Sequence, residues 1–181
     1  MNHLAVDTIS VLRSWAESSY DAVLPIELMD RMPTMWGFGI AHQGGLSIVW
    51  SDVTNQGQAD WTVQMAGGLA MGVPDPRGAL TWVNNMNRRT IFTKYYSVMS
   101  GDQSAAAIAC EMSLSGVHFD LLFNGPHGPG TFQSLGGWAR AMLNLLVQST
   151  TEGCREIVGT MGGGVFPPSD QGLMTLLGVV G

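Results

Sequence analysis

The stretch WTVQMAGGLAMGV at residues 61–73 decides the fold of this 181-residue chain. Its first half places an apolar side chain at every second position from Trp61 to Met65, which is the pattern of a half-buried β-strand. The pair Gly67-Gly68 then interrupts the alternation, and glycines inside a strand indicate a bulge or a sharp bend. We therefore expect a long, bent strand in the middle of the sequence.

Further strands lie before and after this one. Residues 36–42 and 46–52 are two short apolar runs around a glycine-containing turn, which is the pattern of a β-hairpin. Residues 92–99 and 108–115 form a second pair around the turn Ser100-Gly101-Asp102. Strands that are joined by tight turns must be antiparallel. The sequence therefore predicts an antiparallel sheet of about five strands.

Helix signals flank and divide these strands. Asp7 can cap a first helix, Asp75 followed by Pro76 can start a second, and Thr131 can cap a long third helix that continues to about residue 158. The predicted order is α-β-β-β-α-β-β-α. Because the strands alternate apolar and polar residues, we expect the helices on one face, in a two-layer α+β sandwich.

The composition excludes several classes of protein. Charged residues make up 12% of the chain, about half the usual share of ~25%, and the net charge is −6. A nucleic-acid backbone needs clustered cations, so we expect no nucleic-acid partner. No apolar run reaches the ~18 residues that span a bilayer, so we expect no membrane partner. The two cysteines, Cys110 and Cys154, form no disulfide framework, and we expect a cytoplasmic location.

Few residues have the chemistry of a catalytic or metal site. His118, Asp120 and His127 are the candidates, but no second acidic cluster supports them as metal ligands. The sequence contains no Gly-x-Ser-x-Gly elbow, and no histidine lies near either cysteine in sequence. We therefore expect no enzyme, no metal and no cofactor. The alternative is a small metal- or ligand-binding enzyme that uses the His118, Asp120 and His127 loop.

A soluble chain with so few charges must bury apolar surface or present it to a partner. Twelve methionines and six tryptophans supply adaptable contact area. We expect a homodimer and a candidate apolar binding surface on the central strand. The residues of this candidate surface are Trp61, Val63, Met65, Leu69 and Met71.

The most specific stretch is WVNNMNRRTIFTKYY at residues 82–96. It resembles the YbjN family and the related type III secretion chaperone-like proteins, in which a helix ends in an Asn-x-x-Asn-type motif before an aromatic strand. Asn84 and Asn87 match the two asparagines, and Phe92 matches the strand aromatic. Met86 stands where the family commonly has an aromatic residue. The order of elements matches over about residues 5–151, and the residue detail over about 74–114.

The resemblance implies a chaperone-like, non-enzymatic module that holds an extended or partly folded peptide against an apolar surface. A third hypothesis is a regulatory or scaffold domain that only dimerises. The residues themselves allow a structural reading of the motif, because Asn84 and Asn87 lie on one helix face near its end. Their amides can satisfy the last helix carbonyls and the following turn, so we expect a helix-to-strand joint rather than a ligand site.

The chain divides into two parts by composition. Residues 1–158 contain all the predicted strands and long helices, and we expect one chaperone-like domain there. Residues 159–181 are a linker rich in glycine and proline, followed by an apolar end segment. Exposure of so many apolar side chains is unfavourable, so we expect this segment to dock on its own domain or on a neighbouring subunit.

Overall fold

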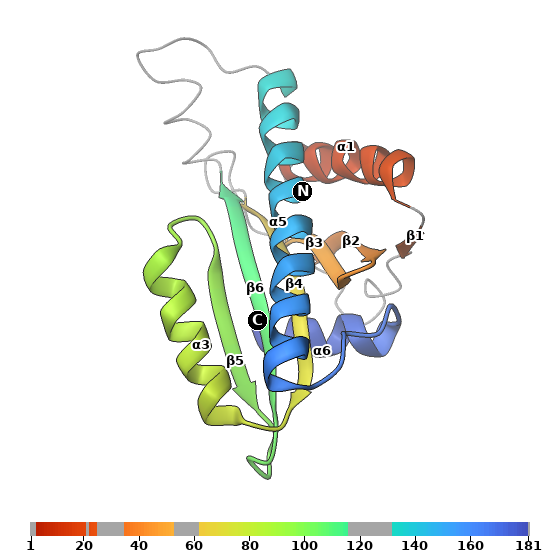
Figure 1. The fold of residues 1–181 in the computed structure, drawn as a ribbon. Coiled ribbons are helices and arrows are strands. Elements are labelled where there is room, and N and C mark those ends of the chain that lie inside the picture. Colours follow the sequence, from red (N-terminus) through yellow and green to blue (C-terminus); the bar gives the residue numbers. More distant parts are fainter. Residues whose placement is uncertain (1–2, 21, 25–34, 53–61, 116–131, 181) are drawn as a thin grey trace.

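The computed structural model describes residues 3–20, 22–24, 35–52, 62–115 and 132–180 (Figure 1). Ten elements follow one another in these ranges. They are α1 (His3–Ser19), β1 (Ala22–Leu24), β2 (Met35–His42), β3 (Gly45–Asp52), β4 (Thr62–Val73), α3 (Pro76–Arg89), β5 (Lys94–Met99), β6 (Ala106–Ser115), α5 (Phe132–Met161) and α6 (Asp170–Val180).

The strands form one antiparallel sheet in the order β1-β2-β3-β4-β6-β5. The hairpin of β2 and β3 pairs His42 with Gly45, at the turn that the sequence predicts. The expected α+β class with an antiparallel sheet is confirmed, and β1 adds a short sixth strand at the edge beside β2.

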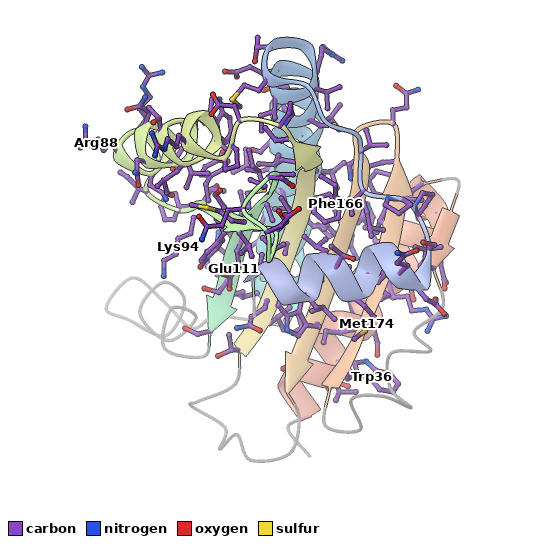
Figure 2. All side chains as sticks on the ribbon, turned by 90° about the horizontal axis from the view of Figure 1, so that it is seen from below. Trp36, Arg88, Lys94, Glu111, Phe166 and Met174 are labelled. Carbon is purple, nitrogen blue, oxygen red and sulfur yellow. The ribbon has the colours of Figure 1, made fainter. Side chains whose placement is uncertain are left out.

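Helices cover both faces of this sheet, which differs from the expected arrangement with helices on one face. α1, α3 and α5 pack on one face, over a core that includes Ile40, Val63 and Met112. α6 crosses the strands on the opposite face (Figure 2), over a second core that includes Ile48 and Phe166. The reason is that the second face of β3 is apolar as well, so it also needs a cover.

The tail therefore forms part of the described fold. α5 runs to Met161, and the following segment returns along β4, where Met71 and Gly164 exchange two backbone hydrogen bonds of 2.8 Å. Phe166 is fully buried, and Leu173 and Leu176 of α6 are buried beside it. This docking on the chain's own domain is one of the two placements that the apolar sequence of the segment predicts.

Gly67 and Gly68 allow close packing on the two faces of β4. A Cβ atom at Gly67 would collide with Oγ1 of Thr150 on α5. A Cβ atom at Gly68 would collide with the ring of Phe166 on the opposite face. Because interiors pack at close to crystal density, a methyl group at either position would force the facing side chain to shift. Two adjacent residues without side chains thus let both layers approach the same strand.

The predicted irregularity in β4 is confirmed. Its pairing with β6 shifts register between Gly68 and Ala70 and again between Ala70 and Val73. Leu69 consequently packs in the core beneath α5, whereas Met71 packs on the side of α6. A strand with a bulge changes the face to which its later side chains point.

α3 begins as its sequence predicts. The Asp75 side chain accepts a hydrogen bond of 3.0 Å from the backbone N–H of Gly78, and Pro76 occupies the first turn. Arg88 and Arg89 occupy the last turn, where the helix dipole favours cations.

We expect Gly67→Ala to lower the free energy of unfolding by about 1–3 kcal/mol, because its methyl group overpacks the interface with Thr150. Gly159→Ala is the control: a Cβ atom there meets open space, so stability should stay unchanged or rise by up to about 1 kcal/mol. Urea unfolding followed by circular dichroism measures both variants. Equal unfolding midpoints for the two variants would contradict the close approach of α5 to β4.

Candidate functional site

The candidate surface residues on β4 lie mainly in the core. Val63, Met65 and Leu69 are fully buried beneath the helices of the first face. Met71 is partly buried on the opposite face, and Trp61 lies outside the described residues. The buried side chains therefore form no accessible surface, because α1 and α5 take up the apolar face that the alternation of β4 predicts.

The asparagine motif joins α3 to the edge strand β5. Oδ1 of Asn87 accepts a hydrogen bond of 2.8 Å from the backbone N–H of Tyr95, and Nδ2 of Asn87 donates one of 3.0 Å to the carbonyl oxygen of Tyr95. The Asn87 amide thus pairs with β5 as a neighbouring strand would. The Asn84 side chain has no hydrogen bond to a described residue, so of the two motif asparagines Asn87 makes the joint.

Phe92 does not lie in the strand, because β5 begins two residues later, at Lys94. Its side chain is 75% exposed, and the neighbouring Ile91 is 91% exposed. Thr90 shapes this turn: its hydroxyl lies 3.0 Å from the carbonyl oxygen of Met86 and 2.9 Å from that of Thr93. The sequence predicts a strand from residue 92. The contacts of Thr90 extend the turn to Thr93, so the strand begins only at Lys94.

β5 is an edge strand with hydrogen-bonding groups on its outer side. The pairing of Tyr95 with Asn87 shows that odd-numbered residues direct their N–H and C=O away from β6, since these groups alternate along an antiparallel strand. Ser97 and Met99 follow in the same orientation. No described residue pairs with the outer backbone groups of these two residues.

A hollow of about 400 Å³ lies beside this free edge. It lies where the end of α6 meets β4, β5 and β6, and several of the residues that line it are small. The residues that line it are Met71, Gly72, Val98, Met99, Ser100, Ala105, Ala106, Ala107, Thr175, Gly178 and Val179. Val98 and Met99 are each 43% exposed at its rim. The free edge and the apolar hollow together form the candidate site, which we name the β5 groove.

Two tyrosines fix β5 to the rest of the fold. Tyr95 packs edge-to-face against Trp82 at 5.5 Å between ring centroids, and Nε1 of Trp82 donates to Glu156 of α5 at 2.9 Å. On the opposite face the Tyr96 hydroxyl donates to Glu111 at 2.6 Å. Burial is the largest cause that raises the pKa of each tyrosine to about 12. Both phenols are therefore protonated at neutral pH and anchor β5 through these contacts.

A partly buried polar cluster that the sequence did not indicate lies at the turn between β2 and β3. Nδ1 of His42 accepts a hydrogen bond of 3.2 Å from the backbone N–H of Gly44 and lies 3.4 Å from the Thr151 hydroxyl. Nε2 of His42 therefore carries the proton, and it lies 2.9 Å from the Ser47 hydroxyl. Burial lowers the pKa of His42 from 6.5 to about 4. Ser47 is fully buried and His42 is partly buried, and the contact with Thr151 fastens the turn of the hairpin to α5.

The other candidates for chemistry are outside the described residues or buried. His118, Asp120 and His127 lie outside them, and no group of three metal-binding side chains occurs in the described part of the chain. Burial raises the pKa of the Cys110 thiol to about 11, so this thiol is unreactive. No helix among the described elements is both long and apolar enough to cross a membrane.

Comparison with known proteins gives one similarity of fold. No family model matches the sequence, and no curated protein matches it. A solved structure that it resembles is YbjN from E. coli, with 12% identity and a TM-score of 0.39 over 68% of this chain and 84% of that chain. The resemblance to YbjN is confirmed as a resemblance of fold alone, and no function follows from it.

We expect Asn87→Ala to lower the free energy of unfolding by about 1–2 kcal/mol, because it leaves both backbone groups of Tyr95 without their partner. Asn84→Ala is the matched control, three residues away on the same helix, and should change stability by less than about 0.5 kcal/mol. Thermal and urea unfolding measure the difference. Equal losses of stability in the two variants would show that Asn87 does not hold the edge of β5.

We expect stability to fall as the pH falls from about 6.5 towards 4. The pKa of His42 is lower in the folded chain than in the unfolded one. As the pH falls, the unfolded chain therefore binds a proton at His42 first and is stabilised relative to the folded chain. Unfolding free energies at a series of pH values measure the slope, and His42→Gln should flatten it above pH ~5, where carboxylates titrate little. An unchanged slope in this variant would refute the lowered pKa of His42 in the folded chain.

Proposed function

We propose that this chain is a non-enzymatic protein-binding module that holds an extended peptide segment in the β5 groove. The observation that carries the proposal is the free edge at Ser97 and Met99 beside an apolar hollow of about 400 Å³. An extended peptide can add to such an edge through backbone hydrogen bonds, while a hollow beside the edge selects its side chains.

The edge offers hydrogen bonds that the chain itself leaves unused. Asn87 takes the outer groups of Tyr95, so a peptide can pair only with the part of β5 beyond that residue. The free part of the β5 edge is therefore short, and a peptide can pair with it only at Ser97 and Met99.

The hollow supports an apolar preference. Met71, Val98 and Val179 supply apolar walls, and Ala105 to Ala107 leave space because their side chains are small. No acidic or basic residue is among the residues that line it. A Leu-sized or Phe-sized side chain of the peptide would gain about 1.5–3 kcal/mol on burial there. We therefore expect the β5 groove to bind extended peptides that carry at least one bulky apolar residue.

The buried polar groups support a binding role rather than catalysis. His42 is neutral and fixed by backbone and hydroxyl partners, and Cys110 lies fully buried with a raised pKa. A nucleophile must reach its substrate, and the Cys110 thiol is enclosed by the fold, while both ring nitrogens of His42 already have partners within the chain.

A second copy of the chain could occupy the same edge. Antiparallel pairing about a twofold axis can place Ser97 of one chain opposite Met99 of its partner, because both residues direct backbone groups outward. This geometry gives the expected homodimer a specific interface. Peptide and partner chain would then compete for β5, and a peptide would dissociate the dimer.

We expect Gly178→Phe to weaken peptide binding at least about tenfold, because the new ring fills the hollow. A Cβ atom at Gly178 meets open space, so the fold should tolerate it. Gly159→Phe is the matched control, since this α5 glycine also meets open space but does not line the hollow. Peptides selected from a random displayed library are the probes, and fluorescence anisotropy measures their affinity.

Met99→Pro tests the edge separately. Proline removes the outward N–H of Met99 and no bond of the β5–β6 ladder, so it should weaken the same peptides while thermal stability changes little. Enriched peptides that bind both variants as tightly as the parent chain would refute the β5 groove. A library that yields no peptide specific for the parent chain would refute the proposed function itself.

A further inference from the structure

The basic residues of the chain are concentrated around α3 and β5. Residues 76–101 contain four of the eight Lys and Arg residues, namely Arg77, Arg88, Arg89 and Lys94, and none of the fourteen Asp and Glu residues. The rest of the chain is therefore strongly acidic. Arg88, Arg89 and Lys94 are all exposed, and Figure 2 shows Arg88 and Lys94 on the same side of the molecule.

Two large apolar side chains project between these cations. Ile91 is 91% exposed and Phe92 is 75% exposed, the two highest values among the large apolar residues of the described chain. Their turn is held in shape, because Thr90 bonds to Met86 and Thr93 and the Thr93 side chain is buried. We name the residues Arg88, Arg89, Ile91, Phe92 and Lys94 the basic tip.

We propose that the basic tip docks this chain on the surface of an anionic lipid bilayer. A projecting pair of apolar side chains needs a receptor that accepts it, and the apolar boundary below lipid headgroups does so without a matching pocket. The flanking cations face the anionic headgroups, each with a favourable contribution. The proposal departs from the sequence-level expectation of no membrane partner, which rested on the absence of a spanning segment.

The remaining charge of the chain fixes its orientation on such a surface. The acidic remainder is repelled by anionic lipid, so the chain approaches with the basic tip first. The β5 groove lies at the opposite end of the six-residue strand β5, which is roughly 20 Å long. A chain docked through the tip therefore leaves the groove open, and the two proposals can fail independently.

Co-sedimentation of the full chain with vesicles tests the proposal. One set consists of phosphatidylcholine with phosphatidylserine, and the other of phosphatidylcholine alone. We expect binding to the anionic set, weakened by added salt. Replacing Arg88, Arg89 and Lys94 by glutamine should lower this binding about a hundredfold, and Ile91→Ser with Phe92→Ser should lower it at least tenfold.

Matched controls separate the tip from general charge and general apolar exposure. Arg140→Gln with Arg155→Gln removes exposed cations from α5, and Leu145→Ser removes a half-exposed apolar side chain from the same helix. Both controls should bind the anionic vesicles within about twofold of the parent chain. Equal losses in control and tip variants would overturn the proposal.

A label at the tip measures insertion directly. Cys110 and Cys154 are buried, so a cysteine introduced at Ile91 can be labelled selectively with an environment-sensitive dye. We expect a blue shift on anionic vesicles for Ile91→Cys and none for Ser104→Cys in the β5–β6 turn. No shift at Ile91, or no vesicle binding by the parent chain, would overturn the proposal. Tip-dependent binding of polyglutamate or single-stranded DNA without vesicle binding would likewise assign the tip to another partner and overturn it.

Discussion

The fold depends on close packing at two adjacent glycines in β4. Thr150 of α5 presses against Gly67 from one face, and the ring of Phe166 presses against Gly68 from the other. β4 lies between β3 and β6 in the middle of the sheet and makes extensive contact with both. The two glycines therefore set how closely α5 and the segment around Phe166 approach the sheet. A side chain at Gly67 would disturb the core beneath α5, and one at Gly68 would disturb the core beneath α6.

This two-sided cover determines where a partner can bind. The apolar residues of β4 that alternate towards α1 and α5 are core residues, so the sheet faces offer no broad apolar surface there. The edge at β5 is different, because Asn87 closes it at Tyr95 and leaves Ser97 and Met99 open. The end of α6 stops short of filling the space beside this edge, and the β5 groove results.

Local signals in the sequence predicted much of this fold. The alternation and the glycine pair predicted β4 with its bulge, and Asp75 with Pro76 predicted the start of α3. Burial could not be predicted in the same way, because alternation shows that one face is apolar but not what covers it. Asn87 was expected as a joint, yet its pairing with Tyr95 depends on where β5 begins. Phe92 shows the same limit: its aromatic type favours a strand, whereas the hydrogen bonds of Thr90 place it in an exposed turn.

Amide hydrogen exchange of the isolated chain at low concentration tests the central claim, that β5 has a free outer edge beyond Tyr95. The account predicts an alternating pattern: fast exchange at Ser97 and Met99, and slow exchange at Tyr96 and Val98, which pair with β6. Tyr95 should also exchange slowly, because its N–H bonds to Asn87. Protection of Ser97 and Met99 equal to that of Tyr96 and Val98 would contradict the account, since the edge would then already be occupied.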